Sequence, residues 1–283
     1  MEEIKITSAN KNNNLIQITR DFIRPYEKFC VQLVEKLNQK DENVQIVVRE
    51  INDDFLICGL FYFSDGGTVL PFFLEKDFYV EQAVKKFFSE ISVFCVSGEQ
   101  SSVDFVLQII QSLKKQQIKD VRDFFLMTNK SGNNVEIKKD GFYFRQGTKD
   151  DSDFLFPLQI AYIREEVLPD GVDINLPAER FAMDRLLKKG KIYVIVDENG
   201  MIVCKAQING ESDSCNLIGG VFTAESFRKN GLALFMMKSL INKSSEENKN
   251  CVLFVNKIND AAMGLYEKSG FSEIGKYKIV YIV

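Results

Sequence analysis

The chain has 283 residues, of which 45% are hydrophobic and 27% charged, so it can fill normal hydrophobic cores and keep a charged surface. It contains no histidine, which excludes Ser-His-Asp and Cys-His nucleophilic sites and the usual histidine-containing zinc sites. The net charge of −4 is spread evenly along the chain, so no basic half is available for binding nucleic acid.

The six cysteines are scattered without CxxC spacing, and most lie in apolar runs where a thiol behaves as a small buried hydrophobe. We therefore expect no metal. The N-terminus lacks the apolar segment of a secretory signal, and no apolar run is long enough to span a bilayer. These features predict a soluble, cytoplasmic protein without a membrane partner.

Apolar spacing along the first half predicts an alternation of helices and strands. A polar stretch over 129–141, suited to a linker or an exposed hairpin, ends it. The predicted elements are a helix over 21–38, strands over 44–51 and 55–63, a helix over 77–91, a strand, Ser-Gly turn and helix over 92–115, and a strand over 123–128.

The pattern restarts after Gly141, so we predict domains at 1–140 and 141–283 and a mixed α/β (α+β) fold. A helix capped by Asp151 or Ser152 follows the first strand, and the pair Asn199-Gly200 predicts a hairpin. The predicted elements are a strand over 142–147, helices over 150–168 and 177–190, strands over 191–208, a strand over 215–223, a helix from about 231, a strand over 250–257, a helix over 259–270, and two short strands near 274 and over 278–283.

The segment Arg228-Lys229-Asn230-Gly231-Leu232-Ala233 joins an apolar strand to an apolar helix. The first turn of a helix has unpaired backbone N–H groups and a dipole that favours anions. The small residues Gly231 and Ala233 would let a phosphate approach this backbone, and the two cations would add charge. The alternative is an ordinary Asn-Gly turn with surface cations.

Two sequence blocks resemble the GCN5-related N-acetyltransferases (GNAT superfamily). Arg228-x-x-Gly231-x-Ala233 matches the acyl-CoA-binding signature Q/R-x-x-G-x-G/A, and the run LFVNKINDAAMGLYEKSGF resembles the later strand and helix of the family. The order of elements over 142–283 also fits. The resemblance implies a GNAT acyl-CoA N-acyltransferase fold in the C-terminal half, with acetyl-CoA as the co-substrate.

The resemblance also implies roles for particular residues. Tyr266 falls where the family often keeps a tyrosine that protonates the leaving thiolate, and core packing is its alternative role. A main-chain N–H near Val221 or Phe222 would polarise the thioester carbonyl. The residues implied to bind the cofactor are Val221, Phe222, Thr223, Arg228, Lys229, Asn230, Gly231, Leu232, Ala233 and Asn259.

Two features in these blocks have alternative explanations. Asn259 would lie near the pantetheine arm or would cap the following helix. Gly219-Gly220 would form a bulge that splays the strand to admit the cofactor, or would mark a weak strand start.

The general base has several candidates because histidine is absent. A carboxylate, a tyrosine, a chain terminus or a relayed water can accept the proton of the amine. Glu166 is our first candidate, with Glu165, Glu211, the Val283 carboxylate and water as alternatives.

The first half has no RxxGxG/A match. Its segment 93–110 has a strand–turn–helix rhythm, but Glu99 and Gln100 stand where cations would be. We interpret this half as a degenerate GNAT-like copy that shapes the acceptor site without binding CoA; the alternative is an unrelated α+β interaction domain.

The function implied is N-acetyl transfer from acetyl-CoA directly to a primary amine of a small molecule or peptide. The alternative is a non-catalytic acyl-CoA-binding sensor or interaction module. Either a monomer or a homodimer is compatible with the sequence.

Overall fold

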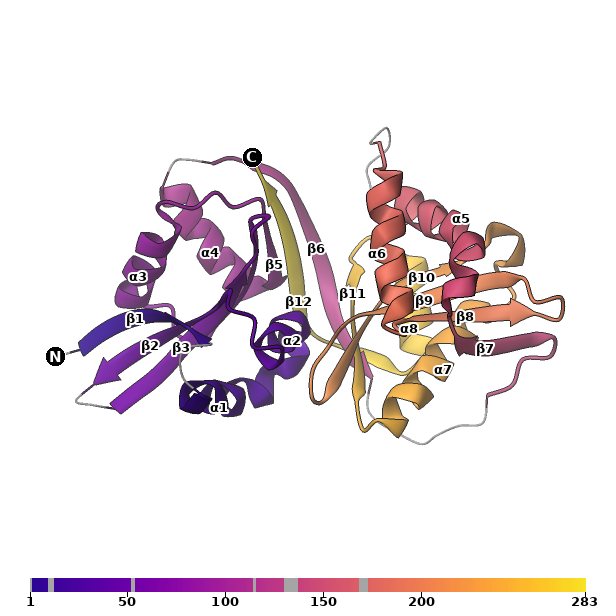
Figure 1. The fold of residues 1–283 in the computed structure, drawn as a ribbon, viewed down its shortest axis with the longest axis horizontal. Helices are drawn as coiled ribbons and strands as arrows, with labels where there is room; N and C mark the ends of the chain where they lie inside the picture. Colours follow the sequence, from indigo (N-terminus) through magenta and orange to yellow (C-terminus); the bar gives the residue numbers. More distant parts are fainter. Residues whose placement is uncertain (1, 10–12, 52–53, 114–115, 130–136, 168–172) are drawn as a thin grey trace.

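A computed structural model describes residues 2–9, 13–51, 54–113, 116–129, 137–167 and 173–283. Its strands form one mixed sheet that runs through two lobes, in the order β1-β2-β3-β4-β5-β12-β6-β11-β10-β9-β8-β7. Figure 1 shows the first half of the chain on the left and most of the second half on the right. No helix in these residues is long and apolar enough to cross a bilayer.

The first half follows the predicted order of elements, except that one predicted helix is divided and that two strands, β1 and β4, were not predicted. Its strands are β1 (Glu2–Ser8), β2 (Val44–Ile51), β3 (Asp54–Phe63), β4 (Thr68–Phe73), β5 (Cys95–Glu99) and β6 (Ile118–Asn129). Its helices are α1 (Asn13–Ile23), the 3-10 helix η2 (Arg24–Phe29), α2 (Val31–Asn38), α3 (Phe78–Phe88) and α4 (Gln100–Ser112).

The single helix predicted over 21–38 is wrong. Pro25 lies in the first turn of η2, which separates α1 from α2. Proline has no N–H to donate and its ring clashes with the preceding turn, so the α-helix cannot continue through it. The polar linker predicted over 129–141 falls largely on residues 130–136, which lie outside the described residues.

The second half follows the predicted order closely. Its strands are β7 (Phe142–Gln146), β8 (Ile192–Asp197), β9 (Ile202–Glu211), β10 (Cys215–Thr223), β11 (Asn250–Asn256) and β12 (Phe271–Ile282). Its helices are the 3-10 turn η3 (Lys149–Asp151), α5 (Ser152–Tyr162), the π-helical turn η4 (Ile163–Val167), α6 (Leu176–Lys188), the 3-10 turn η5 (Glu225–Phe227), α7 (Leu232–Glu246) and α8 (Asp260–Lys268).

Two local predictions in this half need correction. The two short C-terminal strands are one strand, β12, with a register shift between Glu273 and Gly275 where it pairs with β6. The N-cap of α5 is Asp151, one of the two predicted residues, but its side chain does not cap that helix; it accepts from the Thr148 N–H in the capping box of η3 instead.

The last strands of the two halves are exchanged at the centre of the sheet. β12 of the second half pairs antiparallel with β5 of the first, and β6 of the first half pairs antiparallel with β11 of the second. β6 and β12 also pair with each other, and they are the long central strands of Figure 1. Each half therefore completes its sheet with a strand from the other, and the division at 140/141 remains a prediction.

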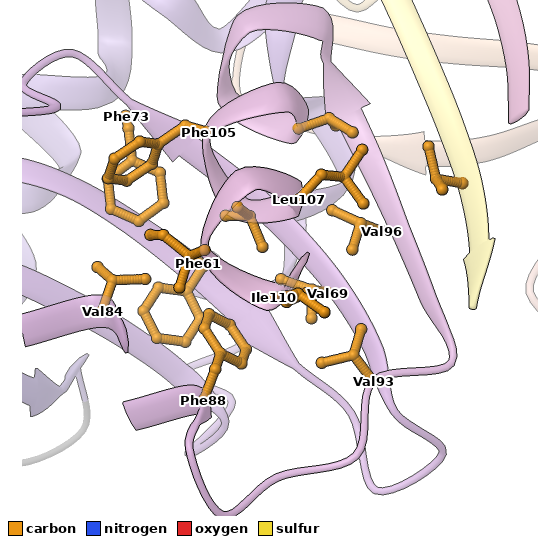
Figure 2. Close-up of a cluster of buried hydrophobic side chains, with 14 of the residues drawn as sticks. Phe61, Val69, Phe73, Val84, Phe88, Val93, Val96, Phe105, Leu107 and Ile110 are labelled. Atoms are coloured by element: carbon orange, nitrogen blue, oxygen red, sulfur yellow. The ribbon is translucent and has the colours of Figure 1, made fainter. Parts of the chain in front are cut away.

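Helices cover both faces of the sheet in each half. In the first half, α3 and α4 cover a phenylalanine-rich core on one face, and Figure 2 shows Phe61, Phe73, Phe88 and Phe105 packed together there. Helices α1 and α2 cover the other face. In the second half, α7 and α8 cover one face, and α5 and α6 cover the other. All six cysteines are buried as free thiols, as predicted.

The two halves have the same order of central elements. A parallel pair, β4 and β5, is joined by α3 in the first half, and a parallel pair, β10 and β11, is joined by α7 in the second. The counterpart of the predicted cofactor loop, residues 228–233, is therefore the β4–α3 connection. The comparison of segment 93–110 with that loop is wrong, because β5 and α4 correspond to β11 and α8.

Candidate active site

A gap opens in the sheet between β10 and β11. The two strands pair only over Cys215–Leu217 with Asn250–Val252 and then separate. On its other side, β10 loses its register with β9 between Gly219 and Phe222, and Gly220 has a left-handed φ of 59°. The predicted bulge is confirmed. It leaves Gly220 and Val221 outside the regular pairing, as expected where a ligand inserts beside a strand.

Helix α7 presents an uncapped N-terminus to this gap. Its N-cap is Gly231, which has a left-handed φ of 74° and no side chain to accept from the first N–H groups. Among the described residues, a Cβ atom added there would meet only the Lys139 ammonium, at 3.8 Å, so the space is open. The helix has no acidic residue in its first turn. These features suit a bound phosphate.

The residues next to this N-terminus differ in how accessible their side chains are to a ligand. Lys229 takes a left-handed φ of 63°, and the Asn230 amide donates to the Phe227 carbonyl oxygen at 3.3 Å. Both side chains are exposed, whereas Leu232 is buried in the core, so only its backbone is available to a ligand. Ala233 lines the cleft.

Arg228 is held by several contacts rather than free in solvent. Its Nη2 donates to both carboxylate oxygens of Glu165, at 3.1 and 2.8 Å, and its Nε donates to the Thr223 carbonyl oxygen at 3.1 Å. Its guanidinium also lies 5.1 Å from the ring centre of Phe222. An anion arriving at α7 would compete with Glu165 for this cation.

A cleft of about 450 Å³ occupies the gap between the strands. It brings together predicted residues from four separate segments. The residues named from the sequence that line it are Glu165, Glu166, Val221, Phe222, Thr223, Arg228, Ala233, Asn259 and Tyr266; Lys229, Asn230, Gly231 and Leu232 lie outside its lining.

Tyr266 projects from α8 into the cleft and packs 6.0 Å from the ring of Phe271. Burial raises the pKa of its hydroxyl, and the nearby Tyr162 and Glu166 add to the effect. The described part of the chain offers this hydroxyl no hydrogen-bond partner. A neutral phenol with a free proton can donate that proton to a ligand.

Glu166 lies on η4 at the exposed mouth of the cleft. Its Oε2 accepts from Asn259 Nδ2 at 3.0 Å. Partial burial raises its pKa above the usual carboxyl value, and the charge of Glu165 raises it further; the Asn259 hydrogen bond and Arg228 oppose this. A carboxylate with a raised pKa is a better proton acceptor near neutral pH.

Asn259 uses both ends of its amide. Its Oδ1 accepts from the Ala262 N–H at 3.0 Å as the N-cap of α8, so the capping alternative is correct. The same side chain borders the cleft. Capping therefore does not remove it from reach of a ligand.

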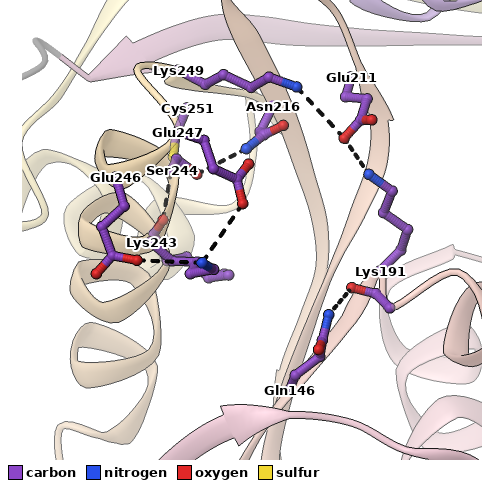
Figure 3. Close-up of polar contacts among 12 residues, drawn as sticks. Gln146, Lys191, Glu211, Asn216, Lys243, Ser244, Glu246, Glu247, Lys249 and Cys251 are labelled. Carbon is purple, nitrogen blue, oxygen red and sulfur yellow. Dashed lines mark hydrogen bonds and ion pairs between the residues drawn. The ribbon is translucent and has the colours of Figure 1, made fainter.

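The other candidate bases lie elsewhere or are already paired. Glu211 bonds Lys191 and lies 3.7 Å from the Lys249 ammonium (Figure 3), and it does not line the cleft. Burial would raise its pKa, but these two lysines lower it on balance. Glu165 is engaged by Arg228. Val283 pairs with Gln117 through its backbone and does not line the cleft.

Three residues that sequence reasoning missed surround the same site. Phe124 of β6 lies across the exchanged strand boundary and packs 5.2 Å from Phe254 in the cleft wall. Tyr162, at the end of α5, lies 6.2 Å from Phe222. Lys205 of β9 is buried beneath Tyr162, with its ammonium 4.6 Å from that ring. The signal for Lys205 was a lysine inside the apolar run IVCKA.

In the first half, the N-terminus of α3 corresponds to that of α7, but it is capped by a side chain. Asp77 caps α3 by accepting from the N–H groups of Tyr79 and Val80, and it is paired with the largely buried Arg49. On the α4 side, the Phe73 N–H donates to Ser102 Oγ at 3.0 Å and ties β4 to the helix. The Asp77 carboxylate thus binds the first N–H groups of α3, whereas the corresponding N–H groups of α7 have no side-chain cap.

Helices α4 and α8 can be compared by counting from their N-caps, Glu99 and Asn259. Ser102 then corresponds to Ala262, and buried Val106 corresponds to Tyr266. The first half therefore lacks the cleft tyrosine. Within the described residues, no group of three or more Cys, Asp or Glu side chains is arranged to hold a metal ion.

Residues 210–280 match the family model described as FR47-like protein. No curated protein matches the chain. Three solved structures are similar over nearly its whole length. A Drosophila protein has a TM-score of 0.67 at 11% identity and covers 100% of this chain and 99% of its own. A tandem GNAT protein from the clavulanic acid biosynthesis pathway has a TM-score of 0.60 at 8% identity, covering 99% and 98%. A GNAT-family acetyltransferase from Colwellia psychrerythraea has a TM-score of 0.58 at 11% identity, covering 98% and 99%.

The fold and the open strand pair define a mixed α/β protein of acetyltransferase architecture. The resemblance of residues 142–283 to the GNAT superfamily is confirmed, and the chain as a whole has the fold of a tandem GNAT protein. The first half is therefore a GNAT-like copy in fold.

Proposed function

We propose that this protein is an N-acetyltransferase that moves an acetyl group from acetyl-CoA directly to a primary amine, with the cofactor bound by its second half. The observation that carries the proposal is the cleft between β10 and β11, which joins the uncapped N-terminus of α7 to Tyr266 and Glu166. The GNAT fold supports it. The cleft therefore combines groups that suit an anion with groups that suit proton transfer.

The residues present fit acetyl-CoA. The N–H groups of Gly231, Leu232 and Ala233 would hold the pyrophosphate, with charge added by Arg228 and Lys229. The open space at Gly231 gives the phosphates access to this backbone. Val221, Phe222 and Thr223 would border the pantetheine arm along the free edge of β10. A main-chain N–H at Val221 or Phe222 would bind the thioester oxygen and stabilise the oxyanion.

Glu166, directly or through a water, would take the proton from the acceptor ammonium. The amine nitrogen then forms a bond to the acetyl carbon. As the carbon–sulfur bond breaks, this nitrogen releases its second proton to solvent, which leaves a neutral amide. Tyr266 would protonate the departing thiolate and recover its proton from solvent. The first half would contribute Phe124 to the wall of the acceptor side without binding CoA.

Turnover separates this function from that of an acyl-CoA sensor. Purified protein is incubated with acetyl-CoA and a panel of primary amines, and acetylated products are quantified by mass spectrometry. Amine-dependent CoA release that is lost in Glu166→Gln and Tyr266→Phe is the expected result. Saturable binding without any turnover would favour the sensor, and absence of binding would contradict both.

A further inference from the structure

The strongest feature that the proposed mechanism leaves unused is the buried Lys205. Its side chain is 1% exposed and makes no ion pair within the described residues. Moving a charged group from water into the protein interior without a carboxylate partner costs on the order of several kcal/mol of desolvation free energy. The burial of this ammonium therefore destabilises the fold, which suggests that the charge serves a function at this position.

The contacts of Lys205 all lie at the β10 bulge. Its Nζ donates to the carbonyl oxygen of Gly220 at 3.0 Å. Phe222 is its cross-strand neighbour, and Tyr162 lies above its ammonium. Gly220, Phe222 and Tyr162 all line the cleft, whereas Lys205 itself lies behind them. Lys205 thus acts on the cleft from beneath, through the backbone of β10.

The Gly220 carbonyl and the Val221 N–H belong to the same peptide group. A hydrogen bond from a cation to the carbonyl withdraws electron density from the amide and makes its N–H a stronger donor, because hydrogen bonds in a chain polarise one another. Charge-assisted bonds are roughly twice as strong as neutral ones. The Val221 N–H is one of the groups that we assign to the thioester oxygen.

We propose that Lys205 is a positioning residue that, through the Gly220–Val221 peptide group, fixes the bulge and strengthens the Val221 N–H as the oxyanion donor. The proposal rests on the proposed acetyl transfer. It predicts that the charge on Lys205 affects the reacting carbonyl more than the affinity for acetyl-CoA.

The surroundings make this charge sensitive to pH. Burial lowers the pKa of Lys205 to about 7, and the adjacent Cys204 opposes the shift. The titratable group packed against it is the Tyr162 hydroxyl on α5, whereas the Cys204 thiol points to the opposite face of the sheet. Both groups have raised pKa values and stay neutral. The neighbours across β8 and β10 are Val194 and Phe222. The ammonium, and its effect on the amide, should fade as pH rises through about 7.

The test uses acetyl-CoA labelled with ¹³C at the thioester carbonyl, bound to the full-length protein. We expect the infrared carbonyl band of the wild-type complex to lie below that of free acetyl-CoA and to move back upward between about pH 6 and pH 8. Lys205→Arg keeps its charge, so its band should not move with pH. Lys205→Met should give the higher band at every pH.

Kinetics give a second readout. Lys205→Met should lower kcat by roughly 10-fold, less than the roughly 100- to 1,000-fold loss that follows removal of a whole oxyanion donor. The dissociation constant for acetyl-CoA should stay within about twofold, since the stronger N–H stabilises the negative oxygen of the transition state more than the neutral carbonyl of the bound substrate. Lys268→Met, at an exposed lysine on the last turn of α8, is the matched control and should change neither value.

The outcomes are distinguishable. A wild-type band that is independent of pH, or the same in Lys205→Met, overturns the role of Lys205 while leaving acetyl transfer intact. Equal losses of binding and kcat with reduced thermal stability would show a purely structural lysine. If the wild type does not bind acetyl-CoA at all, the proposed function itself fails. If Lys205→Met does not fold, the pH dependence of the carbonyl band in the wild type, compared with that in Lys205→Arg, still tests the role of Lys205.

Discussion

Arg228 and Glu165 face each other across the mouth of the cleft, with Nη2 of the arginine 2.8 Å from one carboxylate oxygen and 3.1 Å from the other. Glu166, the next residue, is bonded to Asn259 on the opposite helix. The π-helical turn η4 is therefore joined to both the cofactor loop and α8. In the proposed complex, the phosphates of acetyl-CoA would replace Glu165 as the partner of Arg228.

Removing this competitor should tighten binding. Exposed ion pairs contribute about 0.2–1 kcal/mol, so Glu165→Gln should lower the dissociation constant for acetyl-CoA by about 1.4- to fivefold at low salt. The gain should shrink at about 0.5 M salt because of screening. Calorimetry measures the dissociation constant at both salt concentrations. The control is Glu267→Gln on the exposed face of α8, which changes the net charge by the same amount. Weaker binding by Glu165→Gln would show that this carboxylate supports the cofactor loop.

Tyr266→Phe should lower kcat about 100-fold or more and leave the KM for acetyl-CoA nearly unchanged, because the hydroxyl acts only as the thiolate leaves. Steady-state kinetics with the best amine of the panel measure this. The control is Tyr143→Phe on β7, which removes an exposed hydroxyl outside the cleft. An unchanged kcat in Tyr266→Phe would assign the tyrosine to core packing.

Glu166→Gln should remove the acidic limb of the pH–rate profile. The base must be ionised to accept a proton, so the wild-type rate should rise with pH as the carboxyl loses its proton. This limb should lie above the ordinary glutamate value, because partial burial and Glu165 raise the pKa of Glu166. The variant should lose about 100-fold or more in kcat. An identical acidic limb in wild type and variant would transfer the role to water or to another group.

The contact between the two halves should contribute to stability. Glu27 of η2 is 4% exposed and accepts from Ser212 Oγ, Ser214 Oγ and the Ser214 N–H at 2.7, 2.6 and 3.0 Å. All three bonds end on Oε2, and Glu27→Gln removes the negative charge that strengthens them, so we expect the free energy of unfolding to fall by about 1–3 kcal/mol. Urea unfolding measures it, and Glu42→Gln at an exposed position is the control. Equal midpoints in both variants would show that this contact is unimportant.

The sequence predicted the second half well because each element there has a strong local signal. The Asn199-Gly200 hairpin and the helix ends at Gly190 and Gly270 appear where expected, and all three glycines take left-handed φ angles. In the first half, β1 and β4 have few such signals. β1 is a polar edge strand that pairs with β2, and β4 contains Pro71. Their strand structure depends on pairing with neighbours.

The site was predicted where it follows a local pattern and missed where it depends on tertiary packing. The bulge at Gly219-Gly220 and the helix start at Gly231 are visible in the sequence. Phe124 enters the cleft only because β6 is exchanged between the halves, which no local pattern indicates. The pairing of Glu165 with Arg228 likewise joins residues 63 positions apart.

The pyrophosphate site at the start of α7 is tested most directly by calorimetry, which measures the affinity of acetyl-CoA for the wild type, Ala233→Gln and Ala233→Glu. Ala233 is the second residue of α7 and lines the cleft. A glutamate at a helix N-terminus stabilises the helix by about 0.3–1 kcal/mol, so the fold should persist, while its charge repels the pyrophosphate. We predict tight binding by wild type, weakened binding by Ala233→Gln and none by Ala233→Glu, with thermal stability kept. Equal affinities of the Gln and Glu variants would contradict a pyrophosphate site at the start of α7.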